Sequence, residues 1–117
     1  MINIPQNDAA DLIARKNAEH QKELDSIAKY FLAGLKKHDA AEVDCTPHMI
    51  GCHFGEDRSR HLEDAIEAAR MFKEKGYHCY YYDGYNGCGV NQRAVRVCKV
   101  PMTNAEIHWE HWDWIPI

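Results

Sequence analysis

The spacing of the apolar residues changes along this 117-residue chain from a helical repeat to the alternation of a strand. In residues 8–38 and 59–75, apolar side chains recur every three or four positions, as on the buried face of a helix. Residues 77–83 are rich in aromatic side chains, and residues 93–100 alternate, as half-buried strands do. Helices that precede grouped strands are typical of an α+β domain. We predict one domain, residues 1–117, with a long N-terminal helix and a second helix packed on a small antiparallel sheet that contains a C-terminal β-hairpin.

The ends of the two helices are predicted from local side-chain chemistry. Asn7 or Asp8 can accept hydrogen bonds from the free amides at the start of the first helix. Asp57 or Ser59 can do the same for the second helix. Gly76 can adopt the left-handed conformation that commonly follows the last turn of a helix, so the second helix is expected to end there.

Shorter segments complete the expected fold. Residues 42–45 predict a short strand, and the nine residues 84–92 are expected to form the loop of the hairpin. Thr103 and Glu106 have the spacing of a capping box, which indicates a helix over residues 104–114. Because tryptophan and histidine are mediocre helix formers, a strand stays open as the alternative for that segment.

The amphipathic patterns of both helices and of the second hairpin strand agree on one core. Its predicted members are Leu24, Ile27, Phe31, Leu35, Leu62, Ile66, Ala69, Phe72, Val95 and Val97. Projected back toward the N-terminus, the stripe of the first helix meets His20, Asn17 and Ile13 in an almost wholly polar stretch. That half of the helix either projects into solvent or packs against something outside the core.

Charge and cysteine content point to a cytoplasmic protein. The formal net charge is −4 and no segment is a basic patch, which argues against direct binding to nucleic-acid phosphates. The five cysteines are odd in number, and residues 1–16 do not resemble a secretory signal peptide. We therefore expect free thiols in a reducing compartment, and no membrane contact.

Potential zinc ligands occur at four positions within nine residues: Cys45, His48, Cys52 and His53. Structural zinc sites usually draw two ligand pairs from separate segments, whereas these four lie in one segment, and adjacent side chains of an extended chain point apart. We therefore expect no metal, no other cofactor and no catalytic residue. The alternative is a small zinc-binding protein, or an enzyme that uses this cluster or Cys88.

Aromatic residues are concentrated between residues 77 and 117, which include every tryptophan. Tyrosine and tryptophan anchor protein interfaces because they offer large, rigid side chains with a polar tip. Alternation along the first hairpin strand places Tyr81 on the face opposite its two tyrosine neighbours, so one of these faces points away from the helices. We predict a binding surface made of Tyr81, Tyr85, Asn86 and Trp114.

The expected partner of this surface is another protein with a basic surface, because Asp83 and Asp113 lie beside the aromatic residues. The polar face of residues 14–23 is the next candidate surface. The leading hypothesis is a small non-enzymatic protein-binding or inhibitor-type accessory protein. In size and character it is comparable to accessory proteins of phages and other mobile elements.

Overall fold

The computed structural model describes residues 1–46, 60–85, 91–108 and 113–117, and these residues form the α+β fold that the periodicity predicts. In chain order, the described elements are α1 (Ala10–Lys37), β1 (Ala40–Asp44), α2 (Leu62–Lys73), β2 (His78–Tyr85), β3 (Asn91–Cys98), α3 (Asn104–Ile107) and β4 (Ile115–Pro116).

The strands of the described residues form one antiparallel sheet in the order β1-β3-β2-β4. Strands β2 and β3 are the predicted hairpin, in which Tyr81 lies opposite Val95. Both strands extend further toward the loop than predicted, because Tyr85 still pairs with Asn91. The loop expected over residues 84–92 is therefore shorter, and its remaining residues, 86–90, lie outside the described part of the chain.

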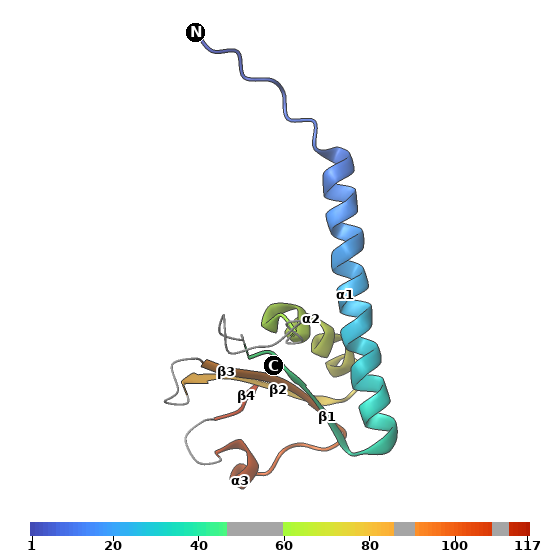
Figure 1. Cartoon of the computed structure of the whole chain (residues 1–117). Coiled ribbons are helices and arrows are strands. Elements are labelled where there is room, and N and C mark those ends of the chain that lie inside the picture. Colours follow the sequence, from blue (N-terminus) through green and yellow to red (C-terminus); the bar gives the residue numbers. More distant parts are fainter. Residues whose placement is uncertain (47–59, 86–90, 109–112) are drawn as a thin grey trace, which may run out of the picture.

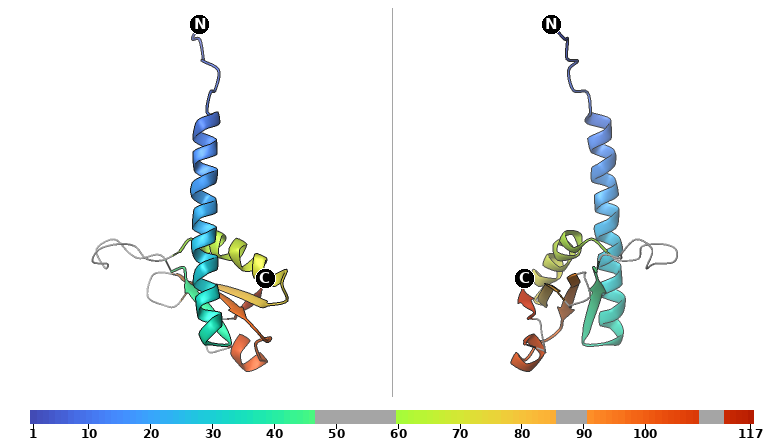
Figure 2. Two further views of the ribbon diagram at one scale, coloured as in Figure 1. Left: turned by 90° about the vertical axis from the view of Figure 1, so that its right-hand side faces the viewer. Right: turned by 60° about the vertical axis from the view of Figure 1, so that its left-hand side comes forward.

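The two long helices cover one face of the sheet, and α3 lies on the opposite side (Figure 1; Figure 2). A main core fills the space between the helices and the sheet, and it includes Phe31 of α1, Phe72 of α2 and Val95 of β3. A second, smaller core lies on the opposite face of the sheet. Its buried members are Tyr80, Ala94, Cys98, Met102 and Trp114.

Alternation along β2 separates its three consecutive tyrosines between these cores, as predicted. Tyr81 packs against the main core, whereas Tyr80 and Tyr82 belong to the second core. The sheet therefore buries apolar side chains on both faces, and the far face depends on the C-terminal segment for its cover.

The predicted core residues of α1 and β3 are all buried. Leu62 and Ile66 of α2 are only half-buried, contrary to the prediction. Helix α2 instead turns Ala65 and Ala68 toward the sheet, together with the predicted Ala69, and all three are fully buried. Small side chains allow the helix to approach the strands closely, so the larger residues lie at the edge of the contact.

Helix α1 is much longer than the body against which it packs. Its buried residues begin at Leu24, and every residue from Ala10 to Lys22 is exposed. Figure 1 shows this half of the helix and the preceding tail extending away from the rest of the molecule. We call residues 1–19 the arm.

The cap predicted for α1 is wrong, and α2 begins later than predicted. Ala9 is the residue that precedes α1 and His61 precedes α2, and neither makes a side-chain capping bond. Asn7 and Asp8 lie too early because α1 begins at Ala10. Asp57 and Ser59 precede the start of α2 and lie outside the described residues.

The predicted chemistry is confirmed at two other helix ends. Gly76 follows α2 with φ of 93°, the left-handed conformation expected there. Thr103 and Glu106 form the predicted capping box, with Glu106 N–H donating to Thr103 Oγ1 at 3.2 Å.

The helix predicted over residues 104–114 ends at Ile107. Trp114 N–H donates to the Ile107 carbonyl at 2.9 Å, so the chain has turned back by that point. The described residues of this segment form no strand either, and β4, which pairs with β2, begins just after it. Burial of Trp114 on the far face of the sheet accounts for the reversal.

Replacement of Phe31 by alanine should lower the free energy of unfolding by about 3–5 kcal/mol, because the ring is fully buried between α1, α2 and the sheet. Its neighbour Leu32 is 47% exposed, and Leu32→Ala is the matched control, with an expected loss under ~1 kcal/mol. Urea denaturation measures both variants. Equal stability of the two would show that this stripe does not form the core.

Candidate functional site

The structure describes the side chains of two of the four residues of the predicted aromatic surface, Tyr81 and Trp114. Tyr81 is half-buried against the main core, on the side of the sheet that the helices cover. Tyr85 is the last residue of β2, and its backbone pairs with Asn91. Asn86 lies outside the described residues. The predicted surface as a whole therefore stays a prediction.

Trp114 is a core residue, contrary to its predicted exposure. Its side chain is 8% exposed and packs edge-to-face on Tyr82, with the ring centroids 4.8 Å apart. The Arg96 guanidinium carbon lies 5.8 Å from the centroid of the Trp114 ring, within the range of a cation–π contact. Trp114 therefore closes the second core and cannot act as an exposed anchor in this conformation.

The two aspartates that suggested a basic partner already have cationic or polar neighbours. Asp83 accepts a hydrogen bond from Arg93 Nε at 3.0 Å, and Asp113 lies 2.9 Å from His108 Nδ1. An acidic side chain with a close partner offers less attraction to a second protein, because its charge is partly compensated.

Buried cysteines weaken the alternative of a thiol-based site. Burial raises the pKa of the Cys45 thiol to about 12 and that of the Cys79 thiol to about 11. Burial also raises the pKa of Cys98. Metal ligation and nucleophilic attack both need the thiolate, which these positions disfavour. His48, Cys52, His53 and Cys88, the other residues of that alternative, lie outside the described part of the chain.

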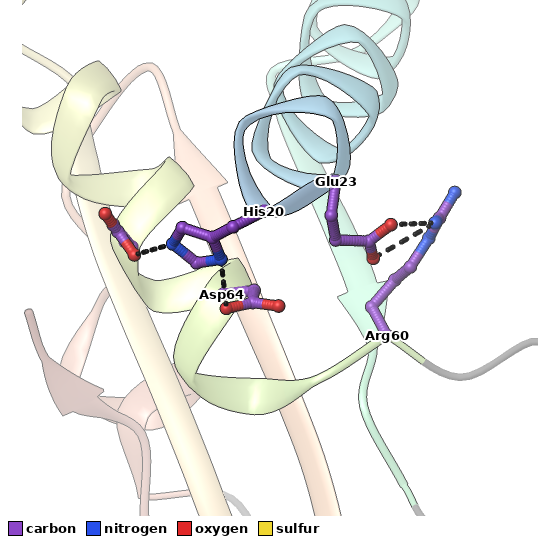
Figure 3. A network of polar contacts seen from close by, with 5 residues as sticks. His20, Glu23, Arg60 and Asp64 are labelled. Carbon is purple, nitrogen blue, oxygen red and sulfur yellow. Dashed lines mark hydrogen bonds and ion pairs between the residues drawn. The ribbon is translucent and has the colours of Figure 1, made fainter. Parts of the chain in front are cut away.

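A polar cluster joins α1 to α2 where the arm leaves the body (Figure 3). The His20 ring lies between two carboxylates of α2. Its Nδ1 is 3.5 Å from Asp64 Oδ1, and its Nε2 is 3.1 Å from Glu67 Oε2. Beside it, Arg60 Nη1 lies 3.2 Å from both carboxylate oxygens of Glu23. We call these five residues the junction.

The junction was missed because the residues that it pairs are 37 to 47 positions apart in the sequence. The sequence placed His20 on the apolar stripe of the first helix, and that position proves to face α2. Acidic residues are common at the start of a helix, because they lie near the positive end of its dipole, so Asp64 gave no separate signal. The spacing of three between Asp64 and Glu67 was the available signal, since it places both on one helical face.

The arm carries the other group of candidate residues. Leu12 is 44% exposed and Ile13 is 56% exposed, and Ile2 and Ile4 of the tail are more exposed still. Ile13 precedes the first buried residue of α1, Leu24, by eleven residues, or about three helical turns. It therefore lies on the same helical face as the core stripe, beyond the region that α2 covers.

Comparison of the chain with protein-family models, with curated proteins and with solved structures gave no match. Among the described residues, no helix has the combination of length and apolar character needed to cross a bilayer. Any function must accordingly be argued from the arm, the junction and the aromatic residues themselves.

Replacement of Trp114 by alanine should act on stability, with an expected loss of about 3–5 kcal/mol in the free energy of unfolding. Its neighbour Ile115 is 46% exposed, so Ile115→Ala is the matched control with a loss under ~1 kcal/mol. Guanidinium denaturation followed by tryptophan fluorescence and by circular dichroism gives both values. If Trp114→Ala is as stable as the parent, Trp114 does not contribute to the core and is again a candidate for an exposed binding residue.

The buried thiols should react slowly in the native protein. At pH 8, alkylation of Cys45 and Cys79 by iodoacetamide is expected to be at least ~100-fold slower than in the urea-unfolded chain, because raised pKa values suppress the reactive thiolate. Peptide mapping by mass spectrometry follows each site separately. Rapid native alkylation of Cys45 would revive it as a metal ligand or nucleophile.

Proposed function

We propose that this protein is a non-enzymatic accessory protein that binds another protein through the arm. The observation that carries the proposal is the exposure of Leu12 and Ile13 on a helix that extends beyond the body (Figure 2). The sequence ranked residues 14–23 second among the candidate surfaces, and the arm overlaps that segment. Burial of Trp114 removes one anchor of the surface ranked first.

Helix energetics support this assignment. An isolated helical segment of about ten residues is marginal in water, because most helical stability in proteins comes from packing of an apolar face. Residues 10–19 of α1 are exposed throughout, yet they continue the core stripe through Ile13. A partner that packs on Ile13 would bury this face. The helix that it contacts is already formed, because it continues from the part of α1 that packs on the body. Such preorganisation lowers the entropic cost of binding.

The tail extends the same surface. Met1, Ile2 and Ile4 are among the most exposed apolar residues of the described chain. Large apolar side chains on an extended segment can enter pockets of a partner, while the helix of the arm lies in a groove. An inhibitor-type role is one form of this function, because a protruding helix can occupy a groove that another ligand needs.

Charge and compartment complete the proposal. Residues 10–19 carry two acidic and two basic side chains, Asp11, Glu19, Arg15 and Lys16. The charge of the arm alone therefore does not favour a basic partner over an acidic one. The salt dependence of association tests whether the partner surface is basic. Three buried free thiols, Cys45, Cys79 and Cys98, support the cytoplasmic setting, where thiols are kept reduced.

The arm predicts a sharp difference between two single substitutions. Ile13→Glu should weaken partner binding by about 30-fold, since it places a charge on the apolar stripe. Ala18→Glu is the matched control, because Ala18 is also exposed on the arm and lies on another helical face. The partner is first captured by a photo-crosslinking residue at position 13 in native cells, and its affinity is then titrated by calorimetry.

Both variants should keep the parent's thermal stability, because neither side chain is buried. If Ile13→Glu and Ala18→Glu bind like the parent while Tyr81→Ala does not, the aromatic surface is the functional one. If a captured partner binds all three variants with unchanged affinity, the arm is a solvated projection and the proposal is wrong.

A further inference from the structure

The His20 ring is the unusual feature of the junction, because each of its two nitrogens faces a different carboxylate. Two carboxylates this close to one imidazole favour a positive charge between them. A proton on the ring can supply it, and so can a metal ion bound to one ring nitrogen. We infer that His20, Asp64 and Glu67 form a binding site for a divalent transition-metal ion of the zinc type.

The distances support this inference. One ligand atom from each of the three residues lies within 4.8 Å of the others. Zinc bonds of about 2.0–2.2 Å in a tetrahedral site place ligand atoms about 3.3–3.5 Å apart. In the structure the two carboxylates face different nitrogens of the ring, with Nε2 3.1 Å from Glu67 and Nδ1 3.5 Å from Asp64. Binding of one ion by all three residues would therefore require the partly exposed His20 ring and Asp64 side chain to rotate until one ring nitrogen faces both carboxylates.

The supporting structure is suited to a fixed site. Asp64 and Glu67 are three residues apart on α2, so both project from one face of a regular helix. His20 reaches this face from α1, and the pair formed by Glu23 and Arg60 holds the two helices together beside it. Arg60 Nη2 also donates to Ser26 Oγ at 3.1 Å. The Arg60 cation is therefore engaged with α1, away from the two carboxylates of α2 (Figure 3).

The ligand set selects the class of ion. Imidazole nitrogen is a ligand for zinc and its transition-metal neighbours, whereas magnesium and calcium prefer oxygen ligands alone. The side chain of His20 is 46% exposed and that of Asp64 is 23% exposed, so an ion and its bound water can reach them.

This site differs from the cluster at Cys45, His48, Cys52 and His53, and it does not depend on the proposed binding function. An ion held by His20 from α1 and by two carboxylates from α2 would cross-link the helices at the point where the arm begins. Metal binding to the native state should therefore raise the unfolding temperature.

Zinc titration of the full chain tests the inference with a matched pair of variants. His20→Gln should weaken zinc binding at least about tenfold and abolish the zinc-dependent rise in unfolding temperature. His108→Gln is the control, because His108 is exposed and contacts a single carboxylate, that of Asp113. It should bind zinc like the parent. Glu67→Gln is the second test variant, and magnesium at equal concentration should bind none of the proteins detectably.

X-ray absorption at the zinc edge identifies the ligands. Nitrogen and oxygen neighbours alone, lost in His20→Gln, support the site. Sulfur in the coordination shell would assign the ion to cysteines, and the inference would be overturned. Absence of zinc binding by the parent, or equal binding by His20→Gln and His108→Gln, would show that the three side chains form only an ion-pair link between the helices.

Discussion

The edge-to-face contact between Phe31 and Phe72 is the interaction on which the rest of the structure depends. Their ring centroids are 5.6 Å apart, and Phe72 makes a second contact of the same kind with Tyr77, just before β2. Two rings and a tyrosine thus join α1, α2 and the start of the hairpin. The junction lies along the same seam between the helices, so the distances from His20 to Asp64 and Glu67 follow from how these aromatic residues set the helix packing.

Periodicity predicted the architecture well because it reports which face of each element is buried. It could not predict whether one face of the sheet or both faces are buried. Aliphatic residues and phenylalanines are enough to form one core. The tyrosines and tryptophans of the last third are not needed for that core, so a prediction with one core leaves them exposed. The sheet instead has a second apolar face, formed by Tyr80, Ala94 and Cys98, and Trp114 covers it. Burial of this face under Trp114 removes the free-energy cost of exposing its apolar side chains to water.

The candidate site was less predictable than the fold for a physical reason. Helical spacing reveals that Asp64 and Glu67 share a face, and that His20 continues the stripe of α1, but it does not reveal that these faces meet. Their approach depends on the angle and depth at which α2 packs, which the small residues Ala65 and Ala68 control. The cap predicted for α1 was wrong for a similar reason, because more than one residue near the helix start could accept an amide hydrogen bond and α1 begins at Ala10.

The lengths of the two helices explain why the arm exists. At about 1.5 Å per residue, the 28 residues of α1 span about 42 Å and the 12 residues of α2 about 18 Å. Helix α2 can therefore cover less than half of α1. The charged side chains of the junction lie at the end of the contact between α1 and α2, and the apolar core ends there. Ile13 lies beyond that boundary on the same helical face. An apolar face that continues past its own core is therefore the feature on which the proposed binding of a second protein rests.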